Sequence, residues 1–146
     1  MPAGDPVFVD TNVLIYASRP NADQHASARE SLDRMRREGN PLWLSHQVLR
    51  EYLSASTRPQ PSGPALPMSV AISDVERFRA RFNIAEDSAA VLDRLVNLLA
   101  ADTGGGKQVH DANVIATMLE YGITRLLSFN HADFRRFGAL VQLVGT

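Results

Sequence analysis

The sequence contains no cysteine, a single lysine and few aromatic residues. Without cysteine there are no disulfides, thiolate metal sites or cysteine nucleophiles, which is typical of a cytoplasmic protein. No apolar run approaches the roughly 20 residues of a membrane span. Residues 1–5 also lack the basic and apolar regions of a signal peptide. We therefore expect a cytoplasmic protein without a membrane segment.

Neither sign of charge is in excess, because 15 basic and 16 acidic residues give a formal net charge of -1. A chain with this balance does not bind nucleic acid through its overall charge, so any such binding has to be local. Its 146 residues are enough for one sizeable core. We therefore expect residues 1–146 to form a single domain.

The most informative stretch is Val7–Asn12, an apolar run that ends in Asp-Thr-Asn. A short run of β-branched and aromatic residues without alternation predicts a strand buried on both faces, as in a parallel sheet. Asp10 then lies at the carboxyl end of that strand, where ligands bind in open α/β sheets. Thr11 and Asn12 are candidate caps for a helix over 13–17, and Asp10 is alternatively only a helix cap.

The rest of the chain alternates between the two kinds of element. Apolar spacing and turn residues predict helices over 22–38, 46–56, 69–82, 88–101 and 109–121, and strands over 41–45, 83–85, 125–129 and 140–144. Ser45 is a candidate cap for the helix over 46–56, whose apolar stripe includes Val48, Leu49 and Tyr52. The same spacing predicts that Val70 and Leu92 face the core. This alternation is typical of an α/β fold, a sandwich with a mainly parallel central sheet flanked by helices.

Two stretches are rich in proline or glycine. Residues 57–67 hold four prolines and predict an irregular loop within the domain. Residues 102–108 contain three consecutive glycines and resemble a phosphate-binding loop only superficially, because the spacing differs from the Walker pattern and no strand precedes them. We interpret them as a flexible turn.

Four carboxylates are placed where such a fold brings distant segments together: Asp10, Glu51, Asp111 and Asp133. Three of them follow strands or open helices, which directs them to one edge of the sheet. Clustered carboxylates raise each other's pKa unless a positive charge lies between them. Oxygen ligands without cysteine favour Mg²⁺ or Mn²⁺, which also bind phosphate oxygens.

This arrangement suits phosphodiester hydrolysis, in which the metal activates a water and neutralises charge on the phosphate. Each acid alone is also explained as a helix cap or a solvated charge. Supporting roles fall to hydroxyls and amides that can orient the acids or hold metal-bound waters. These candidates are Thr11, Asn12, Ser128 and Asn130.

Two other readings fit the residues less well. The four histidines match no familiar zinc spacing. An aspartyl phosphatase that looks like the haloacid dehalogenase family needs a second acid two residues after the first, and Asn12 occupies that place.

With these acids placed, the sequence resembles PIN-domain ribonucleases, and more narrowly VapC-type toxins of toxin–antitoxin pairs. Four segments carry the resemblance and span nearly the whole chain: Val9–Leu14, Leu49–Tyr52, His110–Ala112 and Ser128–Phe134. It implies a PIN-like three-layer sandwich and an Mg²⁺- or Mn²⁺-dependent endoribonuclease.

The resemblance also implies a site and partners. Asp10, Glu51 and Asp111 would be the metal-binding acids, with Asp133 as the fourth, although Asn130 takes a position that is sometimes acidic in the family. A cognate VapB-like antitoxin would silence the enzyme, with its tail in an apolar groove that reaches the acidic site. Family members usually form homodimers.

RNA would need a local positive rim around the acids, for which the candidates are Arg19, Arg50, Arg58 and Lys107. The competing function is a catalytically silent PIN-like module that binds protein or RNA and whose acids are only caps.

Overall fold

The computed structural model describes residues 4–101, 105–106 and 108–145. Its strands are short and all belong to one sheet. They are β1 (Val7–Val9), β2 (Leu42–Ser45), β3 (Asn83–Ala85), β4 (Arg125–Leu127) and β5 (Gln142–Val144).

Helices make up most of the remaining described chain. They are α1 (Thr11–Ala17), α2 (His25–Arg37), α3 (His46–Ser56), α4 (Met68–Arg81), α5 (Ala89–Ala100), α6 (Gln108–Glu120) and α7 (His131–Phe134), followed by a 3₁₀ turn, η1 (Arg135–Phe137). None of the helices in the described ranges has both the length and the apolar composition needed to cross a membrane.

The sheet has the order β3-β2-β1-β4-β5, and all of its pairings are parallel. β1 is the central strand, with Phe8 opposite Trp43 of β2 on one side and Leu126 of β4 on the other. The chain leaves β1 toward β2 and β3, then returns to the opposite side of β1 for β4 and β5. The carboxyl ends of β1 and β4 are thus the topological switch point of the sheet, where ligands bind in such folds.

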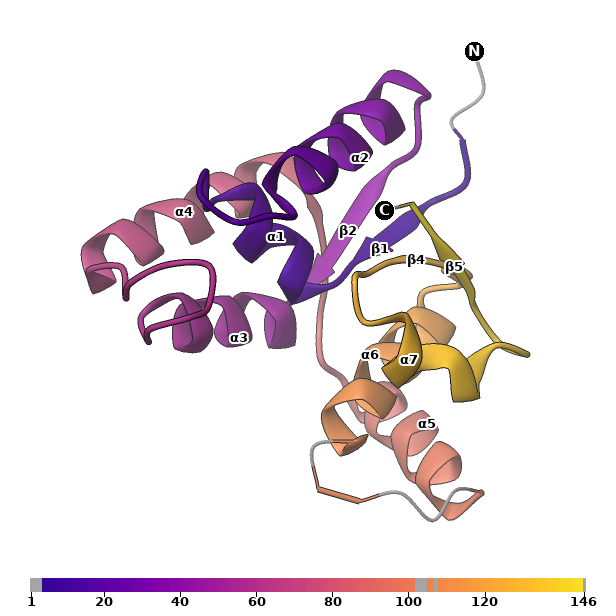
Figure 1. Cartoon of the computed structure of the whole chain (residues 1–146). Coiled ribbons are helices and arrows are strands. Elements are labelled where there is room, and N and C mark those ends of the chain that lie inside the picture. Colours follow the sequence, from indigo (N-terminus) through magenta and orange to yellow (C-terminus); the bar gives the residue numbers. More distant parts are fainter. Residues whose placement is uncertain (1–3, 102–104, 107, 146) are drawn as a thin grey trace.

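This topology places the helices on both faces of the sheet. Crossover connections between parallel strands are right-handed. Helices that connect strands added on one side of β1 therefore lie on the opposite face of the sheet from helices that connect strands added on the other side. Figure 1 shows α1, α2, α3 and α4 on one side and α5, α6 and α7 on the other. The predicted α/β sandwich with a parallel central sheet is confirmed.

The core follows from the pattern of apolar residues. All residues of β1 are fully buried, as predicted for a strand covered on both faces. On α3 the buried residues include Val48, Leu49 and Tyr52, which recur at helical spacing. Ser45 caps this helix, since its hydroxyl accepts a hydrogen bond from the Val48 amide at 3.2 Å.

Some details of the predicted helices were wrong. Val70 on α4 and Leu92 on α5, both expected in the core, are 43% and 57% exposed. α5 packs mainly on α6, and Val91 is its only fully buried residue. Contact with a single helix covers only a narrow side of α5, which leaves Leu92 in solvent. The helix expected from residue 22 begins at His25 instead, without a side-chain cap.

Strand and loop boundaries also shifted. β4 ends at Leu127, which leaves Ser128 and Phe129 outside the sheet, and β5 begins only at Gln142. The stretch 57–67 is a loop, as predicted. Of the turn predicted over 102–108, residues 102–104 and 107 lie outside the described residues.

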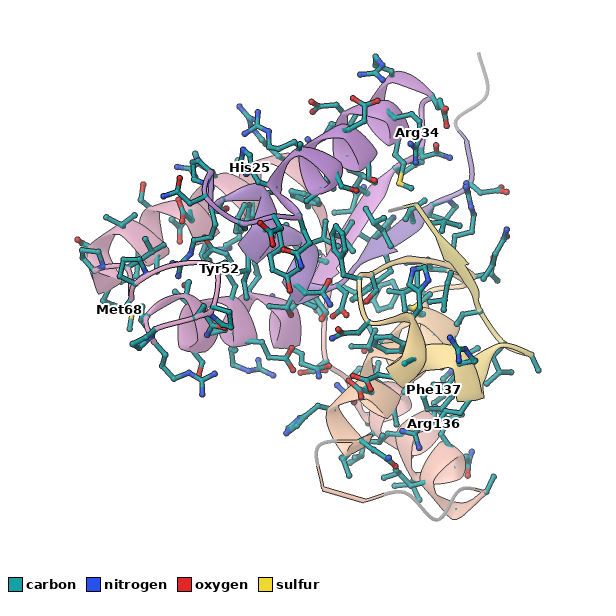
Figure 2. The ribbon with its side chains drawn as sticks, viewed as in Figure 1. His25, Arg34, Tyr52, Met68, Arg136 and Phe137 are labelled. Carbon is teal, nitrogen blue, oxygen red and sulfur yellow. The ribbon has the colours of Figure 1, made fainter. Side chains whose placement is uncertain are left out.

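A buried polar cluster joins α3 to α4. Tyr52, labelled in Figure 2, donates from its hydroxyl to Asp74 Oδ2 at 2.6 Å, and Arg77 pairs with Asp74 Oδ1 at 2.5 Å. Burial and the bond to Asp74 raise the pKa of the Tyr52 hydroxyl. The polar atoms of Tyr52, Asp74 and Arg77 therefore satisfy one another between the two helices.

Candidate functional site

Asp10 combines two tasks at the end of β1. Its Oδ1 accepts from the Thr11 amide at 2.8 Å, so Asp10 caps α1. This corrects the expectation that Thr11 or Asn12 would be the cap. Its Oδ2 accepts from the Ser128 hydroxyl at 2.8 Å, and its side chain is almost fully buried. The cap therefore occupies one carboxylate oxygen and leaves the other facing the end of β4.

The residues after β4 complete this side of the site. The Asp10 amide donates to the Leu127 carbonyl at 2.9 Å, which fixes the two strand ends side by side. Asn12 spans both ends: its amide nitrogen lies 3.4 Å from Asp10 Oδ2 and from Ser128 Oγ, and its Oδ1 accepts from the Phe129 amide. Asn12 and Ser128 thus both contact Asp10 Oδ2, and their supporting role in the chemistry stays a prediction.

Asn130 contributes differently from the prediction. Its backbone amide donates to Ser128 Oγ at 3.0 Å, whereas its side chain is exposed. Its contact with the site thus comes from the main chain.

Glu51 reaches the site from α3. Its Oε2 accepts from the Thr11 hydroxyl at 2.9 Å and its Oε1 from Gln47 at 3.0 Å. Gln47 also donates to the His110 carbonyl and accepts from Asn113, both on α6. This chain of bonds holds the start of α6, and with it Asp111, next to α3.

Glu51 and Asp111 lie near enough to Asp10 to influence it electrostatically. Burial, together with the charges of Glu51 and Asp111, raises the pKa of Asp10 from 3.8 to about 6, even though Ser128 and the Thr11 amide act in the opposite direction. Among the described residues, neither Asp10 nor Glu51 forms an ion pair with a basic side chain.

Asp133 lies half-buried on the short helix α7, which begins directly after Asn130. Its place as the fourth acid stays a prediction.

The donor set suits a hard divalent cation. In the part of the chain that is described, no group of three or more His, Asp or Glu is placed to hold a metal ion by itself. Mg²⁺ does not need such a cage, because it binds through one or two carboxylates and keeps several waters. Burial is the main cause of the raised pKa of Asp10, and the neighbouring acids Glu51 and Asp111 add to it. The residues are therefore compatible with a divalent cation, which would supply the positive charge that this group of acids lacks.

The predicted basic rim is only partly present. Arg19 is 5% exposed and donates to the carbonyls of Pro64 and Ser56, so its assignment to an exposed rim was wrong. Arg50 is exposed and pairs with Asp87. Arg58 is exposed at the end of α3, with its Nε on the Ser54 carbonyl. Lys107 lies outside the described residues.

Gln47 and Asn113 are the residues that the sequence reasoning missed. Gln47 is buried and links Glu51 to α6, and Asn113 fixes the Gln47 side chain. The only available signal was the spacing of Gln47 four residues before Glu51, which allows a contact on one helix face.

Comparisons with known proteins agree on one family. The PIN domain family matches residues 7–140. VapC ribonuclease Mb2897 of Mycobacterium bovis is 30% identical over 138 residues, covering 88% of this chain and 89% of the relative. Ribonuclease VapC48 of Mycobacterium tuberculosis is 28% identical over 130 residues, with the same coverage.

Solved structures share the fold at lower identity. Mycobacterium tuberculosis VapC20, described as a Sarcin-Ricin loop cleaving toxin, superposes with a TM-score of 0.73 at 16% identity, covering 96% of this chain and 99% of that one. VapBC2 of Rickettsia felis, bound to a promoter DNA fragment, gives a TM-score of 0.67 at 20% identity, covering 94% and 96%.

Proposed function

This chain belongs to the PIN domain family, and from that premise we propose that it is an Mg²⁺- or Mn²⁺-dependent endoribonuclease toxin of the VapC type. The observation that carries the proposal is the placement of Asp10, buried at the switch point with its pKa raised beside two further acids. Such perturbed carboxylates at the carboxyl edge of a parallel sheet are typical of catalytic sites.

In this mechanism Asp10, Glu51 and Asp111 would hold the cation, with Asp133 as a fourth acid. When bound, the ion supplies activation of water and neutralises negative charge at the phosphate. The chain itself keeps the acids oriented. Ser128 and the Thr11 amide each hold one oxygen of Asp10, while the Thr11 hydroxyl and Gln47 do the same for Glu51.

The relatives support the substrate and the partners. The two sequence relatives are named ribonucleases, and a Klebsiella pneumoniae structure with the same fold is described as a toxin–antitoxin complex, so we assign RNA as substrate and a VapB-like protein as inhibitor. The chain spans most of the length of these relatives, and we treat residues 1–146 as one domain that forms a homodimer in the cytoplasm. Of the four residues predicted to contact RNA, Arg50 and Arg58 are the two that are both described and exposed.

The experiment that tests this function is cleavage of total RNA by the purified protein. We expect cleavage with Mg²⁺ or Mn²⁺, loss of cleavage in EDTA and recovery when the metal is restored in excess. Cleavage that continues in EDTA would contradict the metal mechanism.

Growth arrest in cells distinguishes the enzyme from a silent binding module. Induced wild type should stop growth and Asp111→Asn should not, with circular dichroism confirming that the variant folds. Arrest by both proteins would favour the module instead.

A further inference from the structure

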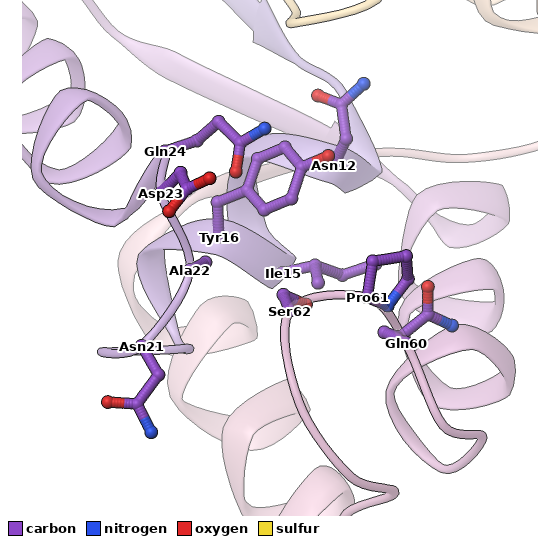
Figure 3. Close-up of a pocket in the computed structure, with 10 residues that line it drawn as sticks. All are labelled: Asn12, Ile15, Tyr16, Asn21, Ala22, Asp23, Gln24, Gln60, Pro61 and Ser62. Atoms are coloured by element: carbon purple, nitrogen blue, oxygen red, sulfur yellow. The ribbon is translucent and has the colours of Figure 1, made fainter.

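A cavity of about 270 Å³ opens directly beside the acidic site. Figure 3 shows the Tyr16 ring among its lining residues, with Asp23 and Gln24 from the turn before α2 on one side and Pro61 and Ser62 from the 57–67 loop on the other. Asn12, which holds Asp10 and Ser128, also lines the cavity. A molecule in it would therefore lie next to the catalytic acids.

The lining excludes a phosphate group as the occupant. No arginine or lysine is among its residues within the described chain, and Asp23 adds a negative charge. A second cavity, of about 460 Å³ between α1, α2 and α4, differs sharply, since Arg29, Arg36, Arg77 and Arg81 line it. The smaller cavity thus suits a neutral group that forms hydrogen bonds.

The cavity has free hydrogen-bonding groups. Asp23, Gln24 and Ser62 line it, and none of these side chains forms a hydrogen bond with another described residue. Carboxylate, amide and hydroxyl groups together can pair with both donors and acceptors. Tyr16 adds a flat ring, held edge to face by Phe129 at a centroid distance of 5.1 Å.

The loop wall of the cavity is built in advance. The buried Arg19 guanidinium donates to the Pro64 carbonyl at 2.6 Å and the Ser56 carbonyl at 3.0 Å. Within the loop, the backbones of Gln60 and Gly63 bond to each other in both directions. These bonds fix Pro61 and Ser62 opposite Tyr16, so the loop should lose little conformational entropy when a ligand binds.

We propose that this cavity, defined by Tyr16, Asp23, Gln24, Pro61 and Ser62, is a nucleobase subsite for a single-stranded RNA residue adjoining the phosphate that is cut. The inference rests on the proposed function. A water takes about 30 Å³ of liquid, so a cavity of about 270 Å³ has enough space for one flat base. Single-stranded RNA is read by stacking bases on aromatic rings and bonding their edges. The prolines and Arg19 thus serve base selection.

The first test is a panel of short single-stranded RNAs that differ only in the bases flanking one cut. We expect wild type to prefer one base by about tenfold in kcat/KM, within the range of a good base contact. Asp23→Asn combined with Ser62→Ala should reduce that preference to less than about twofold. The matched control, Asp93→Asn on the exposed side of α5, should keep the wild-type preference. A preference that survives in the cavity variant, or is absent from wild type, overturns the subsite.

The second test reads binding without cleavage, so that it separates the subsite from the proposed activity. Amide NMR shifts are recorded while Asp10→Asn protein is titrated with a short RNA, and then with the same RNA carrying one abasic residue. Shifts at Tyr16, Gln24 and Ser62 that need the base support the subsite, even if no RNA is cut. Shifts elsewhere only, or cavity variants that weaken binding of the antitoxin but not of RNA, overturn it.

Discussion

Two buried aspartates in this fold have opposite surroundings. Asp74, 5% exposed, lies between α3 and α4 and has a cation of its own, because Arg77 pairs with it one turn further along the helix. Asp10, 7% exposed, lies at the sheet edge among neutral donors and two further acids. One carboxylate is paired with a cation of the chain, and the other has no such ion pair among the described residues.

The difference teaches how to separate a structural acid from a catalytic one. Burying a charge is costly unless it is paired, so a structural acid carries its partner with it. An acid that is buried beside like charges is retained despite its cost to stability, which is typical of functional sites. Substitutions at the two positions should therefore have opposite consequences for activity and stability.

The largest effect should come from Asp10→Asn. Changing a residue that only orients a metal ligand typically costs 10–100-fold in activity, so losing the ligand itself should lower kcat/KM for RNA cleavage by at least about 100-fold. Cleavage of a labelled RNA in excess Mg²⁺ measures this. Asp5→Asn, on the segment before β1, is the matched control and should cleave normally. Equal rates for wild type and Asp10→Asn would place the chemistry elsewhere.

The second effect is a dependence of stability on pH. Burial, with Glu51 and Asp111, raises the pKa of Asp10 from 3.8 to about 6, so the folded state holds this proton more tightly than the unfolded state. The free energy of unfolding should therefore be unaffected by Asp10 below about pH 4, fall as pH rises toward 6, and stay lower by up to about 3 kcal/mol above it.

Urea unfolding of wild type and Asp10→Asn without divalent metal, from pH 4 to 8, isolates that term as the difference between the two proteins. As pH rises, the free energy of unfolding of Asp10→Asn should increase relative to that of wild type. A difference in unfolding free energy that stays constant across this range would mean that the pKa of Asp10 is not raised in the folded state.

A smaller loss of stability is expected at the other aspartate. Asp74→Ala leaves the buried Tyr52 hydroxyl without an acceptor, which should lower the free energy of unfolding by about 2 kcal/mol and Tm by roughly 4–8 °C. Calorimetry measures this, with the exposed Glu76→Ala as control. In a Tyr52→Phe background the cost of Asp74→Ala should shrink, and an unchanged cost would show that the hydroxyl bond is not its source.

The smallest effect should follow Arg50→Ala, which touches neither aspartate. Arg50 is exposed and its pair with Asp87 is a surface one, so stability should change by less than about 1 kcal/mol. If Arg50 contacts a phosphate, the slope of log K for RNA binding against log salt should decrease by about one. An unchanged slope would remove Arg50 from the RNA surface, and Arg37→Ala on α2 is the control.

Much of the fold was predictable because its signals are local. The unbroken apolar run of β1, the stripe on α3 and the Ser45 cap each depend on neighbouring residues, and all appear as predicted. Asp10 could be identified for the same reason, because the six consecutive residues 7–12 are enough to predict that it lies at the end of a strand. Its grouping with Glu51 and Asp111 needed the additional rule that parallel strands share one carboxyl edge.

What could not be predicted depends on contacts between distant segments. Gln47 links Glu51 to α6 only because α6 lies next to α3 in the fold. No sequence pattern around Gln47 predicts that contact. Leu92 was assigned to the core because its spacing fits a stripe, but α5 rests on another helix and buries less. Arg19 was expected at the surface, as arginines usually are, and instead it satisfies the carbonyls of a proline-rich loop.

The bond between Ser128 and Asp10 joins residues 118 positions apart. It cannot form on a growing polypeptide until the segment carrying Ser128 has emerged from the ribosome, because β4 must first pair with β1. Until then the chain has Asp10 but not the hydroxyl that bonds to it. Under the proposed function, this order of assembly delays RNA cleavage until residues up to Ser128 have been synthesised.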